Sequence, residues 1–239
     1  MLERNFIDIN NEEFWNTVTH FIGLILALIG IPFLFFYNTH LSSLSIFSLS
    51  MFSIGLLLVY GSSTIYHRVS EASLKRKLKV IDHISVFYLI LGSYAPVCLI
   101  TLYDYSGVFI FSSVLVIAII GTILKIFYTG RLEILFLIFY LTMGWLIVID
   151  IKTLFEIINT KAKVLLIAGG VSYTVGVLFY AFDKIKFFHS IWHVFVLAGS
   201  IFHYSMILLY IILLLEKQLK KQMDIFSQKN IIINTVIKF

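Results

Sequence analysis

Histidine is the residue type whose spacing first suggests chemistry in this chain of 239 residues. His189 and His193 are four positions apart, which places both imidazoles on one face of a helix, where they can bind a single ion. A third histidine at the same membrane depth can complete a set of ligands. Three neutral imidazoles with an open fourth position are the ligand set of a catalytic zinc site. The alternative is interhelical hydrogen bonding without metal. We predict a Zn²⁺ site that contains His189, His193 and a third histidine at the same depth.

Two further polar residues can complete such a site. Asp82 can act as the base on a zinc-activated water, or hold a ligand in place. Ser63, four residues before His67, can polarise a substrate carbonyl. Both residues have structural alternatives, because aspartate is a good helix cap and serine can bond a backbone carbonyl of its own helix. No glutamate lies within 189–193, so the base must come from another helix.

A polar stripe precedes the first apolar segment. Glu12, Asn16 and His20 recur every four residues on one helical face, and Glu13 lies one turn before Asn16. We interpret this stripe as a hydrogen-bond network near the site, rather than as further metal ligands.

The remaining histidines are not expected to bind the ion. His83 is rotated by about 100° around its helix from Asp82, so the two side chains cannot point inward equally. His203 lies roughly 21 Å along the helix axis from His189, which favours a polar packing role. His40 belongs to a short loop and is expected to be solvated.

The composition defines the elements that must position these residues. Hydrophobic residues make up 60% of the chain and charged residues 13%, against roughly 45–50% and 25% in soluble domains. The single cysteine, Cys98, excludes a disulfide framework. The formal charge of +5 is better explained by loops facing anionic lipid than by nucleic acid. We therefore expect membrane lipids, and no nucleic acid, as partners.

Seven apolar segments are long enough to cross a bilayer, which needs about 20 helical residues. They predict an all-α bundle of seven transmembrane helices. A polar segment, residues 1–17, precedes the membrane domain, residues 18–214, and a polar, lysine-rich tail, residues 215–239, follows it. The predicted spans are 18–37, 44–66, 80–102, 107–128, 132–150, 162–182 and 188–214.

This topology brings the polar residues to one depth. Odd-numbered spans begin, and even-numbered spans end, at the same membrane face. The starts of spans 1, 3 and 7 and the end of span 2 carry five of the seven histidines and one aspartate. These are His20, His67, Asp82, His83, His189 and His193. We expect them to converge, whichever way the chain is inserted.

Positive residues predict the orientation. The short loops on the side of the N-terminus carry ten lysines and arginines, against three on the opposite side. Because cytoplasmic loops are enriched in these residues, we expect a cytoplasmic N-terminus. The five lysines of the tail favour the opposite orientation.

The combination of motifs resembles the hemolysin III family, the bacterial branch of the progestin and adiponectin receptor family. The resemblance is carried by Glu13-x-x-Asn16-x-x-x-His20, Ser63-x-x-x-His67, Asp82-His83 and His189-Ser-Ile-Trp-His193. It covers residues 12–214. It implies seven helices in the bacterial plasma membrane with a cytoplasmic N-terminus, and a zinc ion near the cytoplasmic face held by His67, His189 and His193. It also implies that Ser63 and Asp82 complete the site, as in the related alkaline ceramidases.

Three functions are compatible with these features. The leading hypothesis is a zinc-dependent membrane hydrolase that cleaves an amide or ester of a lipid. A receptor-like sensor of membrane homeostasis, with structural zinc, is the first alternative. The second is a pore-forming cytolysin, which the uniformly apolar sequence disfavours because a secreted toxin needs a soluble form.

Overall fold

The computed structural model describes residues 11–38 and 42–213, and all of its regular elements are helices. Seven helical stretches are long and apolar enough to span a membrane. Their elements are α1 Glu12–Phe36, α2 Ser43–Arg68, α3 Ala72–Pro96 continued by a π-helical turn Val97–Thr101, α4 Gly107–Tyr128, α5 Glu133–Trp145 continued by a 3₁₀ turn Leu146–Asp150 and α6 Ile151–Ile157, α7 Thr160–Ala181, and α8 Phe188–Met206 continued by a π-helical turn Ile207–Ile212.

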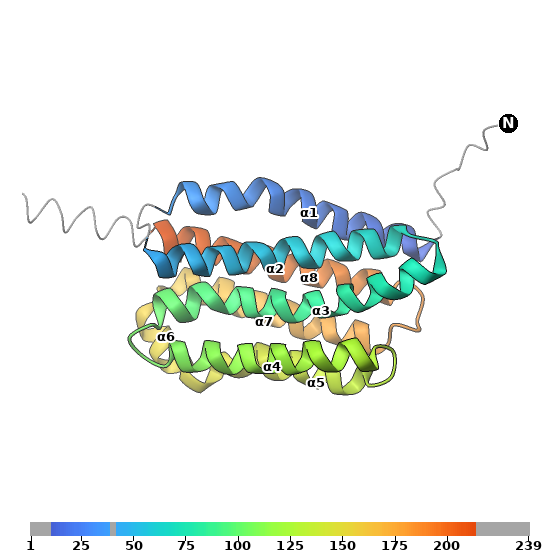
Figure 1. Ribbon diagram of the computed structural model, residues 1–239. Coiled ribbons are helices and arrows are strands. Elements are labelled where there is room, and N and C mark those ends of the chain that lie inside the picture. Colours follow the sequence, from blue (N-terminus) through green and yellow to red (C-terminus); the bar gives the residue numbers. More distant parts are fainter. Residues whose placement is uncertain (1–10, 39–41, 214–239) are drawn as a thin grey trace, which may run out of the picture.

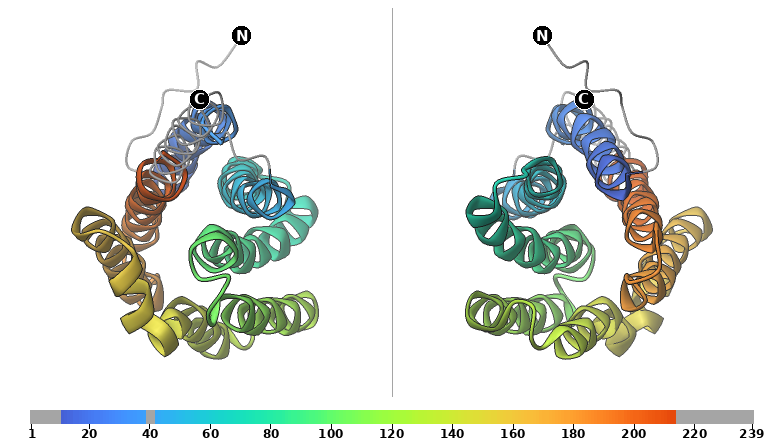
Figure 2. Two further views of the ribbon diagram at one scale, coloured as in Figure 1. Left: turned by 90° about the vertical axis from the view of Figure 1, so that its left-hand side faces the viewer. Right: turned by 90° about the vertical axis from the view of Figure 1, so that its right-hand side faces the viewer.

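The helices run side by side along one common direction (Figure 1). Seen from either end, they follow one another around a ring in chain order, and α8 closes the ring beside α1 (Figure 2). The closest packing is between α2 and α3, between α7 and α8, and between α1 and α2. The N-terminal and C-terminal helices are therefore neighbours, so residues near positions 13–20 can meet residues near 189–193.

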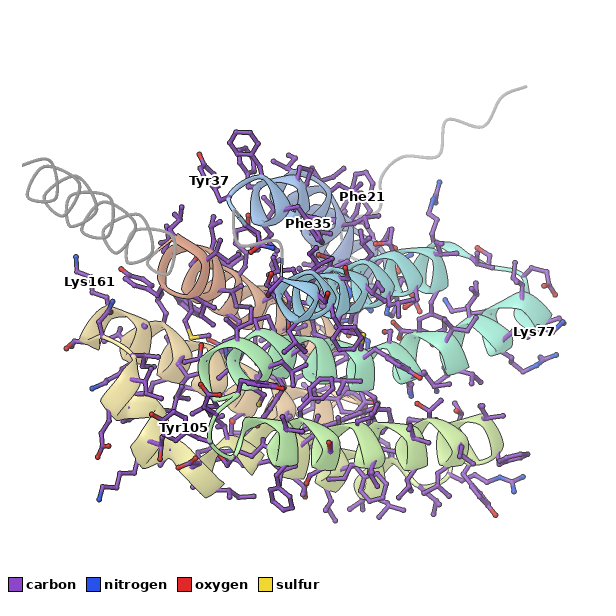
Figure 3. The ribbon with its side chains drawn as sticks, turned by 60° about the vertical axis from the view of Figure 1, so that its left-hand side comes forward. Phe21, Phe35, Tyr37, Lys77, Tyr105 and Lys161 are labelled. Carbon is purple, nitrogen blue, oxygen red and sulfur yellow. The ribbon has the colours of Figure 1, made fainter. Side chains whose placement is uncertain are left out.

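The outside of this ring is apolar. Phe21 and Phe35 extend outward from α1 (Figure 3), and large side chains on α4 and α7, such as Phe127 and Leu178, are exposed to a similar or greater degree. An apolar surface of this extent is stable only in hydrocarbon, because monomeric soluble proteins expose much smaller apolar patches. The chain is a multi-pass membrane protein, and the predicted all-α bundle of seven transmembrane helices is confirmed.

Two helices begin earlier than predicted. α1 begins at Glu12 because the Asn11 side chain accepts a hydrogen bond from the Glu13 amide, at 3.0 Å. α3 begins at Ala72, where the Glu71 carboxylate accepts bonds from the Ser73 and Leu74 amides at 2.7 and 2.6 Å. The same bonds hold the pKa of Glu71 below its usual value. Polar caps extend both helices beyond their apolar segments, where hydropathy gives no signal.

The early start of α3 corrects one interpretation. Asp82 lies ten residues after Ala72, in the interior of α3, and Glu71 is the capping residue. Asp82 is therefore no helix cap.

The fifth span is longer than predicted, since it continues through α6 to Ile157 instead of ending at 150. His40 and the tail from residue 214 lie outside the described residues.

Glycines set the distance between α2 and α3, the two helices that carry Ser63, His67 and Asp82. A Cβ at Gly55 would lie 2.6 Å from the Tyr88 carbonyl oxygen, and a Cβ at Gly92 would lie 2.6 Å from that of Met51. Only glycine allows the two backbones to approach this closely.

Candidate metal centre

Three histidines converge at one end of the bundle. His67 lies in the last turn of α2, and His189 and His193 lie in the first turns of α8. Each of them offers a ring nitrogen, and the three nitrogens lie within 4.8 Å of one another. His67 and His193 are buried, and His189 is half-buried. The structure thus brings together the three predicted ligands, from helices that are more than 120 residues apart in the sequence.

The orientation of His67 is fixed by α1. Its Nδ1 lies 2.7 Å from Glu13 Oε2, and Lys75 Nζ donates to Glu13 Oε1 at 3.1 Å. A carboxylate only accepts hydrogen bonds, so Nδ1 of His67 carries the proton and Nε2 carries the free lone pair. A carboxylate behind a histidine is the usual support of a metal-binding imidazole.

The orientation of His193 is fixed by the same helix. Its Nδ1 lies 3.3 Å from the backbone oxygen of Asn16 and 3.3 Å from Thr19 Oγ1. The carbonyl accepts from Nδ1, which again leaves Nε2 with the lone pair. The Asn16 side chain accepts a hydrogen bond from Ser190 Oγ, so it also holds the first turn of α8.

These histidines fit a zinc ion. The Nε2 atoms of His67, His189 and His193 are all buried and lack hydrogen-bond partners. Leaving a buried polar atom without a partner is costly, and three of them pointing to one place indicate a ligand that accepts lone pairs. Three imidazoles are a common protein ligand set for catalytic zinc.

Asp82 and Ser63 lie next to this cluster. The buried Asp82 carboxylate on α3 has both Ser63 and His67 among its nearest polar neighbours. Ser63 is fully buried one turn before His67. Asp82 does not belong to the group of candidate ligands in the described residues, which comprises the three histidines. Its position suits a group that acts beside the ion.

The other histidines take different places. His20 is buried on α1 and packs its ring on that of His193, with 3.7 Å between ring centroids. The predicted network near the site is therefore built by Glu13 and Asn16, whereas His20 contributes ring packing. His83 faces α4 and accepts from Lys125 Nζ at 2.9 Å through Nδ1. Neither His20, His83 nor His203 belongs to the candidate ligand group in the described residues.

A second polar cluster was not expected from the sequence. Lys125 of α4 is fully buried and donates to Glu133 Oε2 of α5 at 2.7 Å as well as to His83 of α3. Tyr140 Oη donates to the His83 backbone oxygen at 2.9 Å. Lys125 lies three residues before the end of α4, so a hydropathy pattern indicates only a charge near the membrane face. Its partners lie on α3 and α5, so no sequence pattern within α4 indicates the pairing.

A cavity of about 310 Å³ lies beside the metal centre, and its walls are mainly apolar. Val86, one turn after Asp82, and Trp192 and Val196, which flank His193, form the end nearest the histidines. From there the lining follows α8 to Met206 and includes residues of α3, α5, α6 and α7. The cavity therefore begins about one helical turn from the three histidines.

A ring of seven transmembrane helices with a three-histidine cluster at one end defines a class of multi-pass membrane proteins with a candidate metal site. The family described as "Haemolysin-III related" matches residues 9–204. The chain belongs to this family, and the resemblance seen in its motifs is confirmed.

Two bacterial proteins are similar over most of their length. The "Hemolysin-3 homolog" of Bacillus subtilis is 37% identical over 200 residues, which cover 83% of this chain and 94% of that protein. "Hemolysin-3" of Bacillus cereus is 34% identical over 84% of this chain and 92% of that protein. The human "Monocyte to macrophage differentiation factor" is 31% identical over 67% of this chain and 69% of its own length. No solved structure matches the chain significantly.

Proposed function

We propose that this protein is a zinc-dependent hydrolase of the plasma membrane, which cleaves an amide or ester bond of a lipid. The observation that carries the proposal is the convergence of one ring nitrogen from each of three histidines, whose Nε2 atoms are buried and unpartnered, near an apolar cavity. Zinc at this position supplies a Lewis acid and makes a water molecule nucleophilic near neutral pH.

Four further residues of the chain take part in the proposed reaction or support the histidines. Asp82 accepts the proton of the attacking water, and Ser63 donates a hydrogen bond to the carbonyl oxygen of the substrate. Glu13 and Asn16 hold His67 and His193 in the tautomer that a metal needs. The cavity takes the apolar part of the lipid and excludes water from it, since its lining is mainly apolar.

The first test is metal analysis of the purified protein, followed by incubation with a membrane lipid extract and mass spectrometry of released fatty acids. We expect about one zinc per chain, because one set of three ligands is present. The His193→Ala variant should lose most of the zinc and should release no fatty acid from the lipid extract. His203→Phe changes a histidine about 15 Å away along α8 and should keep the metal.

Two alternatives give different results in the same experiment. A membrane-homeostasis sensor with structural zinc would bind the metal and release no fatty acid from any lipid. A cytolysin, the activity that the name of the Bacillus cereus relative states, would release a dye from vesicles without cleaving their lipids. Equal zinc in the wild type and in His193→Ala would contradict the proposed site itself.

A further inference from the structure

His203 lines the cavity beside the candidate metal centre. It is the one histidine among the lining residues. Its ring lies over Gly169 of α7, where a Cβ would come within 2.4 Å of Nε2, and it meets the edge of Tyr173 at 5.3 Å between centroids. Gly169 thus makes room for an imidazole that is held against α7.

The hydroxyl groups that line the same cavity are already hydrogen-bonded within the protein. Tyr94 donates to Gly144 O, Tyr140 to His83 O, Ser93 to Ile90 O and Thr174 to Gly170 O, Tyr173 bonds Ser200, and Tyr180 donates to Glu133. None of these hydroxyls needs a ligand to complete its hydrogen bonding.

His203 differs from them. The one polar group in the described residues that is found to interact with its ring nitrogens is the backbone carbonyl of Leu166, and its Nε2 is buried without a hydrogen-bond partner. A histidine in the hydrocarbon region is neutral, since charge is costly there, and so has one donor nitrogen and one acceptor nitrogen. A carbonyl can match only the donor. The acceptor of His203 therefore lacks a donor.

We propose that the cavity selects lipids whose acyl chain carries a hydroxyl group, which donates a hydrogen bond to His203. The proposal rests on the proposed function for the position of the substrate, with its carbonyl at the metal centre and its chain in the cavity. His203 is ten residues after His193 on α8, which puts the hydroxyl about 15 Å along the chain from the reacting carbonyl. A ketone at the same place has no proton to donate and is not selected.

Ricinoleic acid and oleic acid are suitable probes, because they share chain length and double bond and differ by one hydroxyl in the distal half of the chain. As free acids they cannot be hydrolysed, so binding is measured apart from turnover. We expect ricinoleic acid to bind the full-length zinc protein in nanodiscs about 3–10-fold more tightly than oleic acid, the effect of one hydrogen bond to a buried acceptor. The matching keto acid should bind like oleic acid.

Variants test whether the preference for ricinoleic acid over oleic acid comes from His203. His203→Phe keeps a ring but removes the acceptor and should bind both acids equally. His203→Gln keeps an acceptor oxygen and should retain part of the preference. Ser93→Ala is the matched control, because its hydroxyl lines the cavity but bonds Ile90; this variant should keep the full preference.

Equal binding of the two acids by the wild type would overturn the inference, and so would a preference that survives in His203→Phe. The two proposals fail separately. A preference for ricinoleic acid without any zinc-dependent lipid cleavage would refute the hydrolase and leave the selective cavity. Zinc-dependent cleavage without that preference would refute the role of His203 alone.

Discussion

The polar residues near the start of α1 act through histidines on other helices. Glu13 bonds His67 of α2, and Asn16 bonds both His193 and Ser190 of α8. The spacing of three between Glu13 and Asn16 places them on one side of α1, which faces the junction of α2 and α8. Glu13 and Asn16 therefore hold the candidate ligands from both neighbouring helices in the tautomer that leaves Nε2 without a proton.

Replacing Glu13 by glutamine should weaken the site without removing a ligand. The neutral amide can turn its NH₂ group toward Nδ1 of His67, which favours the wrong tautomer, and it loses the ion pair with Lys75. We expect zinc affinity to fall by about 10–100-fold, the usual effect of losing such a support. A competition titration with a chelator measures it. Glu156→Gln, at an exposed position of α6, should leave the affinity unchanged.

Replacing Asp82 by asparagine separates chemistry from structure. The variant keeps the size of the side chain but loses the carboxylate that can accept a proton. If Asp82 is the base, lipid turnover should fall by about 10²–10⁴ while zinc content stays the same. Turnover assays on samples of equal zinc content check this. Turnover near the wild-type level in such samples would show that Asp82 is not the base.

At the scale of elements, the second polar cluster fastens the α4–α5 hairpin to α3. Lys125 reaches His83 and Glu133, and Glu133 also accepts from the Gly130 amide in the connecting turn, at 2.8 Å. Because His83 follows Asp82 directly, the cluster fixes the segment of α3 that carries the proposed base. Its position behind the site indicates a structural role.

Glu133→Gln should therefore destabilise the bundle. Lys125 would remain fully buried without its counter-charge, and breaking a buried ion pair costs about 3–5 kcal/mol. The Glu133 side chain is about a third exposed, so we expect the lower end of this range. Unfolding in mixed micelles measures the loss.

The double variant Lys125→Met with Glu133→Gln is the matched comparison. It removes the buried charge together with its partner and should recover much of the lost stability. Asp183→Asn, in the exposed turn after α7, controls for the loss of a carboxylate at a surface. A single variant as stable as the wild type would show that Lys125 does not depend on Glu133.

At the scale of the whole molecule, the sequence predicts the features that depend on hydropathy and on the alternating direction of successive helices. The seven spans follow from hydropathy, and the shared depth of His67, His189 and His193 follows from chain direction, since each helix reverses the last. That these three histidines lie close enough to meet depends on the packing of the ring. The extra turns of α1 and α3 are set by Asn11 and Glu71 caps, which lie outside the apolar windows. The cavity and the Lys125 cluster depend on side-chain packing between helices, which has no counterpart in a one-dimensional pattern.

The orientation of the whole molecule in the membrane is the last prediction. Lys77 lies at one end of the bundle and Tyr105 and Lys161 at the other (Figure 3). Since Lys125 is buried and paired, it is left out of the count. The N-terminal segment and the short loops on its side of the membrane then carry nine positive residues by sequence, against three on the opposite side. From the positive-inside rule we predict that the candidate metal centre lies at the cytoplasmic face.

Reporter fusions check this orientation. A phosphatase reporter, active only outside the cytoplasm, should be inactive when fused after Lys77 and active when fused after Tyr105. A cytoplasmically active reporter at the same two positions should give the opposite pattern. Replacing Arg68, Lys75, Arg76, Lys77 and Lys79 by glutamine should weaken the difference, because these residues carry most of the charge bias. Activity of the phosphatase after Lys77 in the wild type would place the three histidines at the outer face, and with them the end of the cavity that receives the lipid carbonyl.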